Sequence, residues 1–287
     1  MSAGGFDFIT IGHINTVTGQ REHEVQMPRF GLGVWQMSEG GECKTAVQHA
    51  ISSGYRLIDT ARSYANEIET GQAIRESGVP RDNLFVVTKL RRPHATSFEA
   101  ALEHCRSSLD KLGLDSIDLY LVHAPPVDIE VRSDVWRGME ECLALGWTKS
   151  IGVSNYGAHH LDDMRAYATI LPAVNQVELH PWNQRPALRA ATEAIGAKVM
   201  AYSPLARGHK VGCENLSKIA KSLDCTPAQA AIKWVYDTGA ITIPKSSNPA
   251  RIEENLASLD IELVGTEAAF AQMEEAYVSG WNPTAEP

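Results

Sequence analysis

Eight short apolar runs recur along the chain, and patterns typical of helices lie between them. The runs occupy residues 29–35, 55–59, 84–90, 117–123, 149–154, 173–179, 198–203 and 240–244. Most of them are continuously apolar and do not alternate with polar residues. Strands of this kind are buried on both faces, as in parallel sheets that are covered by helices. The pattern therefore favours an α/β protein built on a parallel sheet.

Helix signals fill the intervals between these runs. Residues 97–112 place apolar side chains on a single helical face, at Phe98, Leu102, Cys105, Leu109 and Leu112. Thr96 and Glu99 have the spacing of a capping box at the start of that helix. Thr226-Pro227 followed by Gln229, and Asn248-Pro249, predict two further helix starts, because a capping residue precedes a proline in the first turn.

Eight strand–helix units without a Pro-, Gly- or Ser-rich linker predict a (β/α)8 TIM barrel, formed as a single domain over residues 1–287. A doubly wound sheet in two domains is the weaker alternative. It would predict a GxGxxG turn after an early strand, and the glycines at positions 31 and 33 do not form one. Residues 6–11 and 22–27, which precede the first run, predict a β-hairpin across the barrel floor.

Charge and composition exclude several classes of function. The net charge of −9 argues against nucleic acid or an anionic membrane surface as a partner. No stretch of 18 apolar residues predicts a membrane span, and the N-terminus has no signal-peptide pattern. The five cysteines are widely spaced and form no CxxC pair, so we expect neither a disulfide framework nor a metal site. These features predict a cytoplasmic protein.

Polar residues stand where the predicted strands end, which is where barrels of this class carry their active sites. Asp59 ends the second run with Tyr64 close behind, Lys89 lies near the end of the third, and His123 ends the fourth. A lysine ammonium lowers the pKa of a neighbouring phenol, and a carboxylate keeps that lysine charged. A phenol that donates a proton, with an imidazole to orient a carbonyl oxygen, suits carbonyl reduction. The hydride would have to come from a nicotinamide cofactor.

Motifs along nearly the whole chain identify a resemblance. They are LGVW (32–35), GYRLIDTARSYANE (54–67), VVTKL (86–90), DLYLVHAP (118–125), IGVSN (151–155), VNQVELHP (174–181), AYSPLARG (201–208) and ITIPKSSNPARIEEN (241–255). In content and order the sequence resembles the aldo-keto reductase family. The resemblance is greatest to the microbial and fungal-like branch that includes 2,5-diketo-gluconate reductases and prostaglandin F synthases.

The resemblance implies NADPH-dependent reduction of aldehydes or ketones by a monomer, with Asp59, Tyr64, Lys89 and His123 as a catalytic tetrad and Tyr64 as the proton donor. It implies a cofactor site formed by Gly33, Val34, Trp35, Ser154, Asn155, Gln176, Tyr202, Ser203, Leu205, Lys245, Ser246, Ser247, Asn248, Arg251, Glu254 and Asn255. By the same resemblance, the adenosine 2′-phosphate would be bound by Lys245, Ser246, Ser247, Asn248 and Arg251. A phosphate site here is also expected on physical grounds. The N-terminus of a helix that starts at Asn248 attracts anions, and the cations Lys245 and Arg251 lie beside it.

The substrate region departs from the family pattern. Where many relatives have tryptophan, this chain has Ala124 directly after the histidine and Arg91 two residues after the lysine. We predict that Trp35, Arg91 and Ala124 line the substrate pocket, with Arg91 facing an anionic substrate. Arg91 could instead be a solvated loop arginine, and Trp35 a core residue. Two other functions remain open, which are a Schiff-base lyase that uses Lys89 and a nucleotide-binding regulatory barrel without significant turnover.

Overall fold

The computed structural model describes residues 7–38 and 40–286, and its centre is a parallel barrel. The barrel strands are β3 (Leu32–Gly33), β4 (Leu57–Asp59), β5 (Phe85–Leu90), β6 (Leu119–Val122), β7 (Ile151–Ser154), β8 (Val174–Glu178), β9 (Lys198–Tyr202) and β10 (Ile241–Ile243). Each pairs in parallel with the next, from β3 to β10. The Gly33 amide donates to the Pro244 carbonyl oxygen over 3.1 Å, which joins the first strand to the last. The predicted TIM barrel is therefore confirmed.

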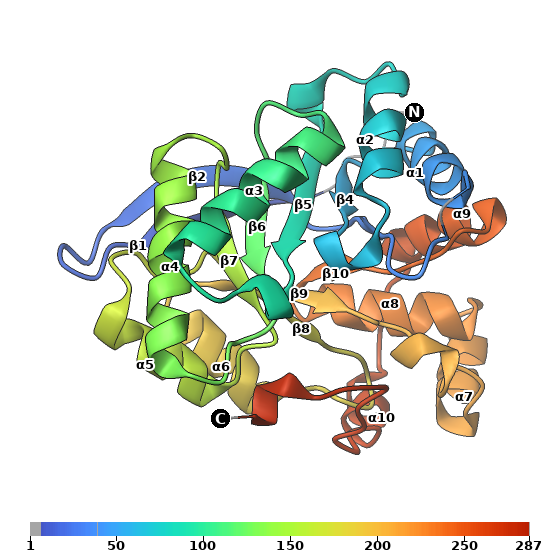
Figure 1. The fold of residues 1–287 in the computed structure, drawn as a ribbon. Helices are drawn as coiled ribbons and strands as arrows, with labels where there is room; N and C mark the ends of the chain where they lie inside the picture. Colours follow the sequence, from blue (N-terminus) through green and yellow to red (C-terminus); the bar gives the residue numbers. More distant parts are fainter. Residues whose placement is uncertain (1–6, 39, 287) are drawn as a thin grey trace.

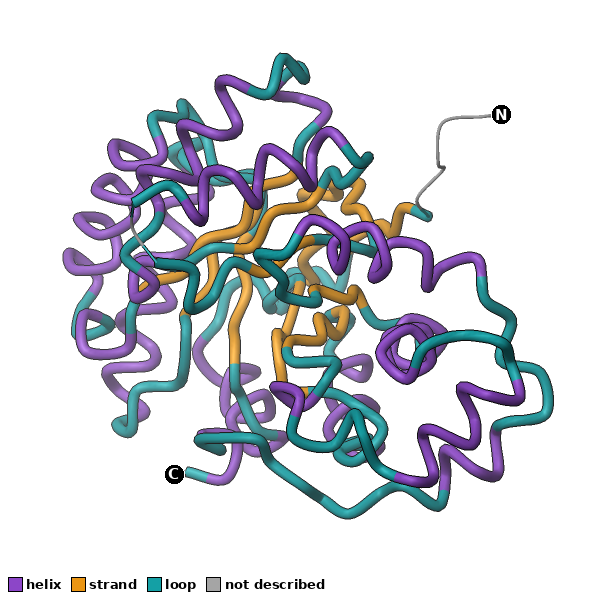
Figure 2. Tube along the Cα trace, turned by 90° about the vertical axis from the view of Figure 1, so that its right-hand side faces the viewer, coloured by secondary structure: helices purple, strands orange, loops and turns teal. Residues whose placement is uncertain are grey.

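Each predicted run contains one barrel strand, although the first strand is much shorter than residues 29–35. Residues 29–31 contact the last strand through one isolated bridge, between Phe30 and Thr242, and so do not extend the β3 ladder. Helices surround the strands on the outside (Figure 2). They are α1 (Glu42–Ser52), α2 (Glu67–Glu76), α3 (Phe98–Leu112), α4 (Ile129–Ala144), α5 (Ala158–Tyr167), α6 (Pro186–Ala194), α7 (Glu214–Ser222), α8 (Pro227–Asp237), α9 (Pro249–Ala257) and α10 (Glu267–Ala271).

Two of the three predicted helix starts are confirmed, and the third is shifted by one residue. A capping box between Thr226 and Gln229 starts α8, and the Asn248 side chain accepts from the Arg251 amide at the start of α9. The capping box predicted from Thr96 is wrong. Ser97 has the extended backbone of an N-cap, and its hydroxyl accepts from the Ala100 amide. Adjacent Thr and Ser are equally suitable caps, so only the backbone conformation distinguishes them.

An antiparallel hairpin of β1 (Phe8–Ile14) and β2 (Arg21–Pro28) precedes the barrel (Figure 1). Ile11 and Met27 of the hairpin are fully buried and pack against the cluster that fills the barrel interior. That cluster includes Leu57, Val87, Leu121, Val174, Met200 and Ile241. The hairpin predicted to close the barrel is confirmed with longer strands, while residue 6 of that prediction lies outside the described residues. Within the described part of the chain, no helix combines the length and apolar character needed to cross a membrane.

His13 of the hairpin is fully buried and hydrogen-bonds to the barrel. Its Nδ1 lies 2.9 Å from the Leu171 carbonyl oxygen, and its Nε2 lies 3.2 Å from the Ser150 hydroxyl. Burial lowers the pKa of His13 from 6.5 to about 4. The folded protein therefore holds this imidazole neutral at a pH where the unfolded chain would protonate it.

We expect stability to fall as the pH drops from about 6.5 to about 4, since the unfolded state then binds one more proton at this residue. Across this range, the titration of His13 should lower the free energy of unfolding by about 3 kcal/mol. Urea unfolding across this range measures the free energy of unfolding of wild type and of His13→Gln. The wild type should lose more stability than the variant as the pH falls. Parallel stability curves for the two proteins would assign the acid sensitivity to other groups.

Candidate active site

The polar residues at the barrel rim belong to the strand face that also fills the barrel interior. Side chains two positions apart on a strand point to the same side. Asp59, Lys89 and His123 each follow an interior apolar residue by two positions, namely Leu57, Val87 and Leu121. Because side chains alternate along a strand, the three polar side chains point towards the barrel axis and lie at one end of the barrel interior.

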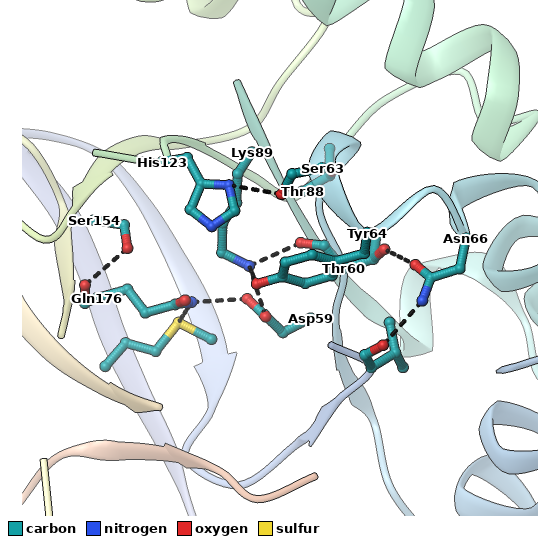
Figure 3. Close-up of polar contacts among 12 residues, drawn as sticks. Asp59, Thr60, Ser63, Tyr64, Asn66, Thr88, Lys89, His123, Ser154 and Gln176 are labelled. Carbon is teal, nitrogen blue, oxygen red and sulfur yellow. Dashed lines mark hydrogen bonds and ion pairs between the residues drawn. The ribbon is translucent and has the colours of Figure 1, made fainter. Parts of the chain in front are cut away.

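Lys89 lies at the centre of this polar group (Figure 3). Its Nζ donates to Asp59 Oδ1 over 2.7 Å, to the Thr60 carbonyl oxygen over 2.8 Å and to Tyr64 Oη over 3.3 Å. The Lys89 side chain is fully buried, and that of Asp59 is 3% exposed. Gln176 donates its amide to the second Asp59 oxygen over 2.7 Å. The ion pair therefore has hydrogen-bond partners on both sides, which a buried pair requires.

Burial acts against both charges of this pair. It raises the pKa of Asp59 and lowers the pKa of Lys89, while the attraction between the two groups opposes both changes. The three oxygen atoms around Nζ are all acceptors in this arrangement, so they favour the ammonium form.

Tyr64 differs from the sequence-based expectation in the direction of its pKa shift. We expected Lys89 to lower the pKa of this phenol, but burial, together with the charge of Asp59, raises it well above the usual value. The expectation was wrong because it considered the neighbouring cation and not the loss of solvent. A phenol in this state keeps its proton at neutral pH, which suits a proton donor.

His123 lies beside the phenol and completes the group. The Tyr64 and His123 rings are 5.6 Å apart between centroids and meet edge to face at 77°. Burial, reinforced by the charges of Lys89 and Arg91, lowers the pKa of His123 to about 3, so its ring is neutral at physiological pH. Its Nδ1 lies 3.2 Å from the Ser63 hydroxyl. The structure thus brings all four predicted tetrad residues together.

A second polar network adjoins the tetrad at the ends of β7, β8 and β9. The Asn155 amide nitrogen donates to the His123 carbonyl oxygen over 2.9 Å, and its amide oxygen accepts from Tyr202 Oη over 2.8 Å. Ser154 Oγ donates to the Gln176 carbonyl oxygen over 2.9 Å. Ser154 and Asn155 therefore do not cap the following helix, whose N-cap is Gly157. The structure groups these four predicted cofactor residues beside the tetrad.

The predicted phosphate residues lie between the end of β10 and the first turn of α9. Asn248 caps the helix, and Ser246 Oγ accepts from the Asn248 amide over 3.1 Å. Lys245 and Arg251 are exposed, and neither forms an ion pair closer than 4 Å within the described residues. An exposed helix N-terminus flanked by two cations can bind a phosphate.

Other predicted cofactor residues vary in how available their side chains are. Glu254 accepts from the Thr226 hydroxyl over 2.6 Å, and Asn255 is buried. Ser203 has a left-handed backbone, with φ of 50°, and Leu205 packs half-buried against the helices. The backbone amides of Gly33 and Val34 are both bonded within the barrel, since Val34 donates to the Asp59 carbonyl oxygen and Gly33 to the Pro244 carbonyl oxygen.

The three predicted substrate residues differ in exposure. Trp35 is half-buried, and the Arg207 guanidinium lies 4.4 Å above the centre of its ring. Ala124 is only 1% exposed, so it offers little surface here. Arg91 is exposed, and its side chain has no hydrogen bond within the described part of the chain. Its neighbour Arg92, in contrast, pairs with Glu286 over 2.6 Å.

Sequence reasoning missed several contacts at the site. These are the Thr60 carbonyl oxygen bound to Lys89, the Ser63 hydroxyl beside His123, and Arg207 over Trp35. The first is a backbone atom, which no residue type reveals. Ser63 could have been suspected because it lies within the motif that contains Tyr64. Arg207 follows β9, and no local pattern connects it to a residue after β3.

No group of three His, Cys, Asp or Glu side chains suited to a metal is found among the described residues.

The fold and the rim chemistry together define an oxidoreductase barrel, and comparison with known proteins agrees. The profile of the Aldo/keto reductase family matches residues 29–277. An aldo-keto reductase of Mycolicibacterium vanbaalenii is 44% identical over 85% of this chain and 86% of its own length. A 9,11-endoperoxide prostaglandin H2 reductase of Trypanosoma cruzi is 42% identical over 88% and 89%.

Solved structures show the same architecture. The Bombyx mori aldo-keto reductase in complex with NADP superimposes with a TM-score of 0.82 and 32% sequence identity, covering 95% of this chain and 96% of its own. The chain therefore belongs to the aldo/keto reductase family. The resemblance read from the sequence is confirmed at the level of the family.

Proposed function

We propose that the protein reduces aldehydes or ketones to alcohols with NADPH, and that Tyr64 donates the proton. The observation that carries this proposal is the contact of Tyr64 Oη with Lys89 Nζ over 3.3 Å, beside an imidazole that is held neutral. The bound cofactor supplies the hydride that the side chains of the protein cannot provide.

Each tetrad residue has a distinct part in this proposal. Tyr64 passes its proton to the carbonyl oxygen as negative charge develops there. The Lys89 ammonium stabilises the resulting phenolate, because the cation is already oriented towards Oη. Asp59 holds that ammonium in place, and neutral His123 orients the carbonyl oxygen through the single N–H of its ring. The tetrad thus polarises the carbonyl group and supplies the proton that water would otherwise have to provide.

The residues present fit a dinucleotide that carries a 2′-phosphate. Asn155 and Gln176 offer amide groups next to the tetrad, where a nicotinamide carboxamide would be held, and Tyr202 offers a ring for stacking. Lys245 and Arg251 at the start of α9 would hold the phosphate. The Bombyx mori relative, solved with NADP, supports the same cofactor for this chain.

The function is tested by following NADPH consumption with a panel of aldehydes and ketones. Turnover with several simple aldehydes is expected. Binding of NADPH without turnover of any carbonyl would instead favour a regulatory barrel, and trapping of Lys89 by borohydride with a carbonyl would favour a lyase.

We expect Arg251→Ala to weaken NADPH binding about tenfold or more, since a charge-assisted contact to a phosphate is worth roughly 1.5–3 kcal/mol. NADH, which lacks that phosphate, should bind nearly as it does to wild type. Titration of each cofactor by fluorescence checks this. Equal losses for both cofactors would indicate that the substitution disturbs α9.

We also infer that Arg91 interacts with anionic substrates. Its side chain is exposed and unengaged, and its charge acts on His123. Arg91→Leu should therefore raise KM about tenfold for an aldehyde or ketone that carries a carboxylate, because a planar guanidinium binds such oxyanions in pairs. A neutral carbonyl of similar size is the control and should change little. If both substrates respond alike, Arg91 is a solvated loop residue.

We further infer that residues 1–287 form a single domain that acts as a cytoplasmic monomer. All five cysteines are free, which supports a reducing compartment.

A further inference from the structure

Glu67 is a buried carboxylate that the proposed reaction does not use. It is the first residue of α2 and follows Tyr64 closely in the chain, and its side chain is only 2% exposed. A carboxylate in such a position is unfavourable unless hydrogen bonds or cations compensate for the lost water. Its two oxygen atoms face two different elements, and those elements carry Tyr64 and Lys89.

One oxygen of Glu67 contacts the strand of the catalytic lysine. Oε1 accepts from the Thr88 hydroxyl over 2.7 Å, and Thr88 is fully buried. Thr88 precedes Lys89 in β5, and neighbouring side chains on a strand point to opposite faces. Lys89 reaches into the barrel, so Thr88 lies on the outer face, towards α2. The carboxylate therefore binds β5 directly behind the lysine.

The other oxygen faces η1 (Arg62–Tyr64), the 3-10 turn that carries Tyr64. Arg62 Nη1 lies 3.8 Å from Glu67 Oε2. That Nη1 is buried and has no hydrogen-bond partner within the described residues, so the carboxylate supplies its compensating charge. Ala65, which ends the turn, has a left-handed backbone with φ of 60°, which is unfavourable for a residue with a Cβ atom. The turn therefore depends on contacts outside itself to keep its shape.

Asn66 fixes the same segment to two other strands. Its Oδ1 accepts from the Thr60 hydroxyl over 2.8 Å (Figure 3), and its Nδ2 donates to the Val34 carbonyl oxygen over 2.9 Å. These contacts reach residues that follow β4 and β3, but they do not reach β5. The hydrogen bond from Thr88 to Glu67 therefore supplies the link to the strand that carries the lysine.

We propose that Glu67 is a positioning residue for the reduction, which holds η1 against β5 and so sets the separation of Tyr64 Oη and Lys89 Nζ. This separation is 3.3 Å. A shift of about 1 Å at reacting groups can cost roughly a hundredfold in rate, even when its cause lies outside the site. Glu67 acts through Thr88 and Arg62, and not on the reacting atoms. The inference rests on the function proposed above, in which Tyr64 donates the proton and Lys89 stabilises the phenolate.

Glu67→Met removes both contacts of the carboxylate and keeps the length of the side chain. It should lower kcat for a simple aldehyde about tenfold or more, while KM and the dissociation constant of NADPH stay within about twofold of wild type. Glu76→Met is the matched control, because it makes the same change at an exposed position of α2, where the carboxylate contacts Lys44 over 2.8 Å. It should leave all three quantities within about twofold of wild type. Urea unfolding of each variant establishes the conditions under which it is folded.

The two contacts are also tested separately, so the inference stays testable if Glu67→Met does not fold. Thr88→Val keeps the branched shape of threonine and removes the hydroxyl, and should lower kcat about tenfold. Thr88→Ser retains the hydroxyl and should keep kcat within about twofold of wild type. Arg62→Met removes the cation from a partly exposed position, and should lower kcat about threefold.

A contribution of Glu67 to stability alone would lower the free energy of unfolding and leave the kcat of the folded variants unchanged. The inference is overturned if Thr88→Val or Arg62→Met keeps the kcat of wild type, if Thr88→Ser loses as much as Thr88→Val, or if Glu76→Met loses as much as Glu67→Met. If Tyr64→Phe retains normal turnover, the proposed proton donor fails and the inference fails with it. An inactive Tyr64→Phe beside an unchanged Thr88→Val or Arg62→Met overturns the inference alone.

Discussion

Replacing Tyr64 with phenylalanine should lower kcat at least about a hundredfold while the affinity for NADPH changes little. The substitution keeps the ring beside His123 and removes only the hydroxyl that contacts Lys89. General acid catalysis contributes roughly 10²–10⁴-fold, and no other phenol contacts Lys89 within the described residues. Steady-state kinetics with a reactive aldehyde and a separate NADPH titration measure the two quantities.

Tyr202→Phe is the matched control for this change. Its hydroxyl also lies at the rim, but it donates to the Asn155 side chain and does not contact Lys89. We expect a loss of about tenfold or less, which corresponds to one hydrogen bond of about 1 kcal/mol. Near-normal turnover by Tyr64→Phe, or equal losses in both variants, would show that Tyr64 is not the proton donor.

The second large effect is expected on stability. Lys89→Met keeps a long apolar stem but leaves the Asp59 carboxylate buried without its cation. Breaking a buried ion pair in this way costs about 3–5 kcal/mol of unfolding free energy at neutral pH. The loss should shrink as the pH falls, because a protonated Asp59 no longer carries an uncompensated charge. Urea unfolding at several pH values measures both effects.

The double variant Asp59→Asn/Lys89→Met separates the lost charge from lost packing. Asparagine retains an oxygen that can accept from Gln176, so the double variant has no buried charge at this position. It should recover at least half of the stability that the single variant loses, although it should remain inactive. A double variant no more stable than Lys89→Met would show that packing of the lysine, and not its charge, determines the effect.

Much of this architecture could be predicted from local patterns. Continuous apolar runs marked all eight strands, and Thr226 and Asn248 marked two helix starts correctly. The positions of Asp59, Lys89 and His123 at the ends of the predicted barrel strands also predicted that the three residues would meet at one rim. These features depend on residues close together in the chain, and so the sequence carries them directly.

Other features of the site depend on the folded structure. The rise in the pKa of Tyr64 comes from burial, which no pattern around the residue reports. Gln176 reaches Asp59 across 117 positions of the chain, and only the closed barrel brings the two side chains together. By itself the sequence determined the order of strands and helices and the residue types at each strand end. Closure of the barrel decided which of them meet and how much solvent they lose, because contacts and burial arise only from packing distant segments together.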